Sequence, residues 1–156
     1  MQTRFINPAS LAKPTGYTHV ATVTGGKSIH ISGQVARDAN GNTVGPGDVG
    51  AQARQVYANL RECLKAAGAG FKDVIKLTAF IVDLTPEKAA AVRVARNECL
   101  SEPFPASTMV GVTALVDPSL LVEIEMTAFV PERATPARTK TKKKTVAKKK
   151  AAKRRR

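Results

Sequence analysis

The positive charge of the chain is concentrated at its C-terminal end. Residues 133–156 contain 13 Lys and Arg and no Asp or Glu, so residues 1–132 hold 12 basic against 12 acidic side chains. A segment made almost only of Lys, Arg, Ala and Thr cannot bury enough apolar surface to offset its conformational entropy, and we predict that it is disordered. The folded domain must therefore be built from residues 1–132, a length suited to a single domain of ~100 to 200 residues.

Two segments of this domain have helical spacing. In residues 48–67, apolar or small residues recur every three or four positions, with Asp48 as the expected cap and Gly68 as the expected stop. A second helix should start at Thr85-Pro86-Glu87, because Thr can cap, Pro fits the first helical position and a carboxylate favours that end of the dipole, and it should run to about residue 100. The side chains expected to face inward are Ala53, Val56, Leu60, Cys63, Leu64 and Ala67 in the first helix, and Ala91, Val92, Ala95 and Cys99 in the second.

Five segments rich in β-branched residues are predicted strands: 17–24, 28–35, 74–84, 108–115 and 120–130. Gly25-Gly26 predicts an antiparallel hairpin between the first two, and Asp117-Pro118 a turn between the last two. The residues before 17 form an irregular start. The order β-β-α-β-α-β-β predicts an α/β two-layer sandwich, with both helices on one face of a mixed sheet. Apolar residues lie on both sides of several strands, so we expect an oligomer that covers the second face.

Other residues exclude several classes of protein. The two cysteines, Cys63 and Cys99, have no paired spacing, which argues against a disulfide framework or a zinc site and favours a reducing, cytoplasmic compartment. No cluster for any other metal stands out, and His30 is expected to face solvent from a strand. No apolar run approaches the ~18 to 20 residues that a membrane-spanning helix needs.

One pair of segments has an arrangement suited to chemistry. Glu123 follows Ser107 by sixteen residues, and Glu123 and Glu125 alternate with apolar residues in a predicted strand. The two carboxylates therefore share one face of the sheet. Either that face meets solvent, which needs no function, or at least one carboxylate lies in a polar site.

Five separated motifs resemble the RidA (YjgF) family in order and spacing. They are Gly16-Tyr17, Ile31-Ser32-Gly33-Gln34, Ala51-Gln52-Ala53-Arg54-Gln55-Val56, Pro105-Ala106 and Leu121-Val122-Glu123-Ile124-Glu125. The resemblance covers nearly all of residues 5–131. It implies a chorismate-mutase-like fold and a homotrimer with clefts between subunits. It also implies hydrolysis of reactive enamine and imine intermediates to 2-oxo acids and ammonia, with no metal and no cofactor.

The same resemblance implies roles for individual residues. Glu123 matches the glutamate that positions or activates water, and Tyr17 and Ser32 match residues of the substrate cleft. Ser107 and Met109 occupy further substrate-binding positions, but the family has an arginine, which grips the substrate carboxylate, where this chain has Ser107. We therefore expect altered or weakened substrate recognition. The arginines that could replace the missing cation are Arg4, Arg37, Arg93 and Arg96.

Two functions from different classes follow. The first is an imine or enamine deaminase. The second is a non-catalytic trimeric scaffold or metabolite-binding protein whose basic tail binds nucleic acid or other polyanions without sequence preference, since no aromatic residues interleave the charges. Such a tail fits a nucleoid-associated protein or, in a eukaryote, a nuclear one; a solvated extension without a partner is the alternative. The expected phosphate-binding residues are Lys142, Lys143, Lys144, Lys148, Lys149, Lys150, Lys153, Arg154, Arg155 and Arg156.

Overall fold

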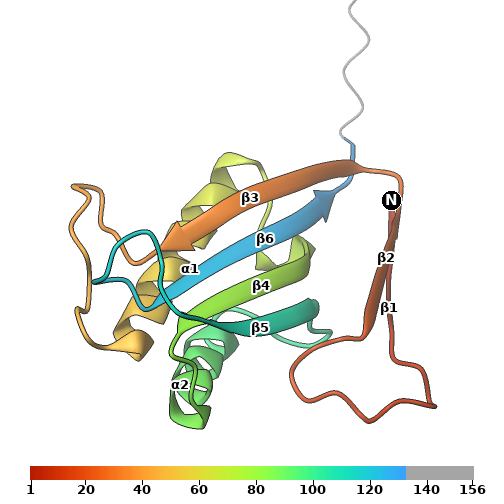
Figure 1. The fold of residues 1–156 in the computed structure, drawn as a ribbon. Helices are drawn as coiled ribbons and strands as arrows, with labels where there is room; N and C mark the ends of the chain where they lie inside the picture. The colour runs from red at the N-terminus through yellow and green to blue at the C-terminus, as the bar shows by residue number, and fades with distance from the viewer. Residues whose placement is uncertain (133–156) are drawn as a thin grey trace, which may run out of the picture.

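Two helices cover one face of a four-stranded sheet in the computed structural model, which describes residues 1–132 (Figure 1). The strand order is β3 (Lys27–Val35), β6 (Val122–Val130), β4 (Val74–Val82) and β5 (Ala106–Val112). β6 is antiparallel to both β3 and β4, whereas β4 and β5 are parallel. The predicted mixed sheet with both helices on one face is therefore confirmed.

Helix α1 (Val49–Ala66) has the predicted start and end. The Asp48 carboxylate accepts hydrogen bonds from the backbone N–H groups of Gly50 and Ala51, at 2.8 and 3.0 Å. After the helix, Gly68 adopts a φ of 78°, a conformation that glycine reaches without steric cost. The residues of the apolar stripe pack against the sheet, most of them fully buried.

Helix α2 (Pro86–Asn97) is also capped as predicted, by the Thr85 hydroxyl accepting from the Lys88 N–H at 3.3 Å. The helix ends three residues before the predicted residue 100. Val92 and Ala95 are buried, as expected. The apolar pattern did not predict that Arg96 would be buried on the same helix.

The predicted hairpin between residues 17–24 and 28–35 is wrong. β2 (Val20–Thr24) pairs instead with β1 (Gln2–Ile6), an N-terminal strand in the part interpreted as irregular, and the two form a separate antiparallel ribbon. Gly25 and Gly26 both have positive φ, so they permit a corner as readily as a chain reversal. Local turn chemistry could not reveal that β1 was available as a partner.

The β1–β2 ribbon lies beyond the ends of the sheet strands (Figure 1). Gly25-Gly26 joins it to the start of β3, and Thr18 forms a parallel bridge with Ala106 at the start of β5. The Thr18 N–H donates to the Pro105 carbonyl at 3.1 Å, and the Thr18 hydroxyl donates to the Phe104 carbonyl at 2.6 Å. The ribbon is thus anchored at both edges of the sheet.

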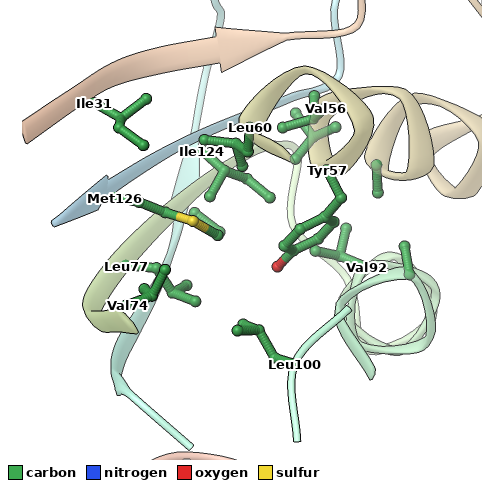
Figure 2. Packing of buried hydrophobic residues seen from close by; sticks show 14 of the residues in the cluster. Ile31, Val56, Tyr57, Leu60, Val74, Leu77, Val92, Leu100, Ile124 and Met126 are labelled. Atoms are coloured by element: carbon green, nitrogen blue, oxygen red, sulfur yellow. The ribbon is translucent and has the colours of Figure 1, made fainter. Parts of the chain in front are cut away.

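One hydrophobic core lies between the sheet and the helices (Figure 2). Alternate residues of β6, such as Ile124 and Met126, point into it, toward Tyr57 and Leu60 of α1.

The last two strands differ slightly from their predicted limits. β5 begins two residues earlier and ends three residues earlier than predicted, and β6 begins two residues later than predicted. The predicted turn between them is confirmed by a 3.0 Å hydrogen bond from the Leu120 N–H to the Asp117 carbonyl.

Neither helix of the described residues covers the other face of the sheet. Phe80 and Val82 alternate with buried Ala79 and Ile81, so they lie on this outer face. Their register partners in β5 are Val110 and Val112, and Val110 is 37% exposed. The outer face therefore carries an apolar group next to polar residues, and an oligomer that covers it stays a prediction.

Candidate functional site

Glu123 lies on the outer face of the sheet, above a β-bulge in β3. It alternates with fully buried Val122 and Ile124, which point toward the helices. The register between β3 and β6 shifts between Ile31 and Gln34, where Ser32 and Gly33 form the irregularity. The Glu123 carboxylate occupies the space next to Gly33, so a Cβ at residue 33 would collide with it.

The Glu123 carboxylate is available for chemistry. Within residues 1–132 it makes no hydrogen bond and has no cation within 4 Å. The neighbouring Ser32 is exposed, and the Gln34 side chain is turned back to donate to the Ser32 carbonyl at 3.1 Å. An unpaired carboxylate beside an exposed hydroxyl can accept a proton from a bound water.

Tyr17 lines a separate cavity of about 760 Å³, which lies between the β1–β2 loop and the segment before β5. Gly16, Tyr17 and Thr18 line it from the loop, and Phe104 lines it from the other side. The loop is internally braced, since His19 contacts the Tyr17 ring edge-on at 5.3 Å, while its ring nitrogen Nε2 bonds to the Ala12 carbonyl at 3.0 Å. The bridge at Thr18 places this cavity beside the start of β5.

Ser107 and Met109 lie on the helix-facing side of β5. They pair with buried Leu77 and Ala79 of β4, and Met109 packs against the core. The intervening Thr108 faces the other way, where its hydroxyl accepts from the Lys76 ammonium group at 2.6 Å. This packing gives Met109 a structural role, and its part in substrate binding remains a prediction.

The predicted site residues are therefore not gathered in one place within a chain. Ser32 and Glu123 lie together at the β3 bulge on the outer face. Tyr17 lies in the loop beside the start of β5, and Ser107 lies on β5 itself, on the helix-facing side of the sheet. The sequence predicted these residues one by one. Apolar residues lie on both faces of β5, so only the pairing of β4 with β5 and β6 shows that Ser107 and Glu123 point to opposite faces.

The structure also shows where the four arginines considered as replacements for the missing cation lie. Arg37 is paired with Asp117 at 2.9 Å, where hydrogen bonds from Ser119 and the Arg37 charge lower the pKa of that carboxyl. Arg4 and Arg93 are exposed. Arg96 is buried, with its guanidinium carbon 5.2 Å from the centre of the Phe104 ring and its Nη2 against Gly16.

Two further searches concern residues 1–132 alone. They contain no group of three or more His, Cys, Asp or Glu side chains that could hold a metal ion. Neither α1 nor α2 combines the length and apolar character required to cross a membrane. The predicted polyanion-binding residues from Lys142 to Arg156 lie outside the described part of the chain.

Comparison with known proteins identifies the family. The family model described as endoribonuclease L-PSP matches residues 8–130. The chain belongs to this family, the RidA (YjgF) family. A RutC family protein of Synechocystis sp. is 34% identical over 133 residues, covering 84% of this chain and 99% of the relative. A 2-iminobutanoate/2-iminopropanoate deaminase of Dermatophagoides farinae is 30% identical over 123 residues, covering 78% of this chain and 92% of the relative.

Solved structures of RidA proteins share the fold. A protein of the conserved Rid family from Yersinia pestis is 39% identical, with a TM-score of 0.75, and the match covers 83% of this chain and all of that one. RidA from the Antarctic bacterium Psychrobacter is 32% identical, with a TM-score of 0.61, and the match covers 76% of this chain and 92% of that one. The replacement of a substrate-binding arginine of the family by Ser107 stays a prediction from the motif Pro105-Ala106-Ser107-Thr108.

Proposed function

We propose that this RidA protein is an imine deaminase, which hydrolyses reactive imines derived from amino acids to 2-oxo compounds and ammonia. The observation that carries the proposal is the unpaired Glu123 carboxylate held above Gly33, beside Ser32. The names of the relatives support the reaction, since several are 2-iminobutanoate/2-iminopropanoate deaminases.

The chemistry needs few groups, because an imine carbon is already electrophilic. Glu123 accepts a proton from water as the water oxygen attacks the C=N carbon, which gives a carbinolamine. This first proton passes to the nitrogen, which completes the neutral carbinolamine. Glu123 then accepts the proton of the new hydroxyl group and gives it to the amino group, so the C–N bond breaks, ammonia leaves and the C=O bond forms. Positioning of the water and one carboxylate able to move a proton are sufficient for both steps.

A complete site requires two copies of the chain in this proposal. Ser32 and Glu123 on the outer face of one subunit would meet Tyr17 and Ser107 of a neighbour, because the two pairs diverge within one subunit. The apolar outer-face residues Phe80, Val82 and Val110 support such contact between subunits. We propose a homotrimer with three such clefts, located in the cytoplasm.

Substrate recognition should differ from that of the archetype. The Ser107 side chain is too short to reach a substrate carboxylate as an arginine side chain does, and it offers one hydroxyl in place of two parallel N–H donors. We therefore propose weakened recognition of a carboxylate at this position.

The test is ammonia release from a freshly generated 2-imino acid, such as the imine tautomer of 2-aminoacrylate. Glu123→Gln should lose ~10²- to 10⁴-fold in rate, the usual contribution of a general base. Glu125→Gln is the matched control, since Glu125 lies on the same strand and face and is exposed. Equal activity of wild type and Glu123→Gln would remove Glu123 from the mechanism, and no activity in the wild type would refute the proposed function.

A second candidate rests on the charge division of the sequence. Residues 133–156 hold 13 basic side chains and no acidic one. In this alternative the domain is a trimeric scaffold or metabolite-binding protein, and the basic tail binds nucleic acid or another polyanion through phosphate attraction alone.

A further inference from the structure

The cavity beside Tyr17 has mostly apolar walls. Three aromatic side chains line its volume of about 760 Å³: Phe5 of β1, Tyr17 of the loop and Phe104 before β5. All three are partly exposed, and Leu11, which also lines the cavity, is 53% exposed. Small-molecule sites in proteins are typically concave, ~300 to 1,000 Å³ in volume and lined mainly by apolar and aromatic side chains. The cavity therefore has the size and the walls of a site for an apolar group.

The charged residues of the cavity do not form a buried ion site. They are Lys13 and Glu102, and both are exposed to solvent. Exposed charges keep their hydration, so they need no ligand to compensate them. The chemistry that the cavity offers to a ligand is therefore apolar contact, with polar groups in water around it.

Contacts within the chain hold the two walls of the cavity in place. Thr18 joins the loop to the segment before β5 through its bonds to the Pro105 and Phe104 carbonyls, at 3.1 and 2.6 Å. Arg96, which does not line the cavity, supports the Phe104 ring by a cation–π contact, with its guanidinium carbon 5.2 Å from the ring centre. Walls that are formed before binding reduce the entropy cost of holding a ligand.

We propose that this cavity holds the side chain of the substrate, and that the chain acts on 2-imino acids with a large apolar side chain, aromatic or branched. The inference rests on the proposed function and specifies its substrate class. The bridge between Thr18 and Ala106 places the cavity beside the start of β5, and Tyr17 of the proposed cleft lines it.

The size of the cavity favours a large side chain over a small one. Several relatives are named for 2-iminobutanoate and 2-iminopropanoate, whose side chains are an ethyl and a methyl group. Groups of that size would leave most of this cavity as water against apolar walls. Each further CH₂ group that is buried improves affinity by about fourfold, and an aromatic ring also gains from edge contacts with other rings. This gain offsets the weakened carboxylate recognition proposed for Ser107.

Hydrolysis of two freshly generated imines by the full chain tests the proposal. kcat/KM for 2-imino-3-phenylpropanoate should exceed that for 2-iminopropanoate by at least about tenfold, since one methylene in an apolar pocket is already worth about 10- to 200-fold. Ala12→Phe should bring this ratio to about one or below, because it adds a ring to the cavity wall at an exposed position. Leu11→Asn should also lower the ratio, because it replaces an apolar wall by a polar one.

Ala90→Phe is the matched control, because Ala90 is also exposed but lies on α2 and does not line the cavity. It should keep the wild-type ratio. A wild-type ratio of one or less would overturn the proposal and leave the cavity to be covered by a neighbouring subunit. An unchanged ratio in both Ala12→Phe and Leu11→Asn would overturn it as well.

Binding of the 2-oxo products separates this proposal from the deaminase proposal. In isothermal titration calorimetry, wild type should bind 3-phenylpyruvate at least about tenfold more tightly than pyruvate, and Ala12→Phe should lose the difference. Such binding by a protein that releases no ammonia would refute only the deaminase proposal. Ammonia release without any preference for the phenyl compounds would refute only the proposed side-chain site.

Discussion

The Glu123 carboxylate occupies the space beside Gly33 in which a side chain at residue 33 would begin. The two residues are brought together by the register shift between β3 and β6, which also exposes Ser32. The bulge thus removes a side chain from the surface on which the proposed water must be held. Its glycine is required for space and not for a left-handed backbone, since φ at Gly33 is not in the positive range.

Gly33→Ala should therefore impair imine hydrolysis while Glu123 remains in the chain. The added methyl group displaces the carboxylate, and a misplacement of about 1 Å can cost ~10²-fold in rate. Ammonia release by the purified variant is the measurement. Gly70→Ala is the control, because a Cβ at residue 70 meets nothing within 4 Å and φ there is negative. Undiminished hydrolysis by Gly33→Ala would show that the position of Glu123 is not critical.

Ser107→Arg should increase hydrolysis of an imino acid at least several-fold, because it restores the carboxylate ligand of the family motif. Ser107→Ala should change little, since the hydroxyl contributes far less than a charged donor. A folded arginine variant without any gain would indicate that the cleft has diverged at further positions.

The outer sheet face should mediate trimer formation. Light scattering should give three times the monomer mass for the full chain and for a chain truncated after Glu132. Val110→Asp should give monomers, because it introduces a charge into the apolar outer face. Val94→Asp is the control, since Val94 is 53% exposed on α2 and lies away from that face. A stable monomer of the truncated wild type would contradict the prediction.

Asp117 should stabilise the fold only where it is ionised. Hydrogen bonds from Ser119, followed by the Arg37 charge, lower the pKa of Asp117 in the folded protein below its usual value. Its stabilising contribution is therefore complete above the unfolded-state pKa of about 3.9 and is lost as the pH falls through the lowered value. Urea unfolding from pH 6 to pH 2 should show a smaller decline for Asp117→Asn than for wild type. Parallel curves would exclude this contribution.

The tail should bind nucleic acid without sequence preference. If each tail neutralises ~3 phosphates, a trimer releases about nine counterions, and log affinity for duplex DNA should fall with log salt at a slope near −8. Random DNA and RNA should bind comparably. Truncation after Glu132 should abolish binding, because the remaining residues have 12 charges of each sign. Binding that survives truncation would move the polyanion site onto the domain, and no binding by the full chain at low salt would leave the tail without this partner.

The starts of both helices and the approximate positions of five strands could be predicted from the sequence because their causes are local. Asp48 and Thr85 cap their helices through backbone N–H groups two or three residues away, and alternation in residues 122–130 assigns each side chain of β6 to a face. The family motifs likewise name Tyr17, Ser32 and Glu123 one at a time. These features depend only on neighbours in the chain, so a linear pattern contains them.

The relationships between distant segments were decided by the tertiary structure. β2 pairs with β1 instead of β3, because a glycine corner allows either partner and only the packed chain selects one. Ser107 and Glu123 diverge because β5 and β6 present them to opposite faces of one sheet. Arg96 meets Gly16 because α2 packs beside the loop before β2, a contact that spacing along the chain does not record.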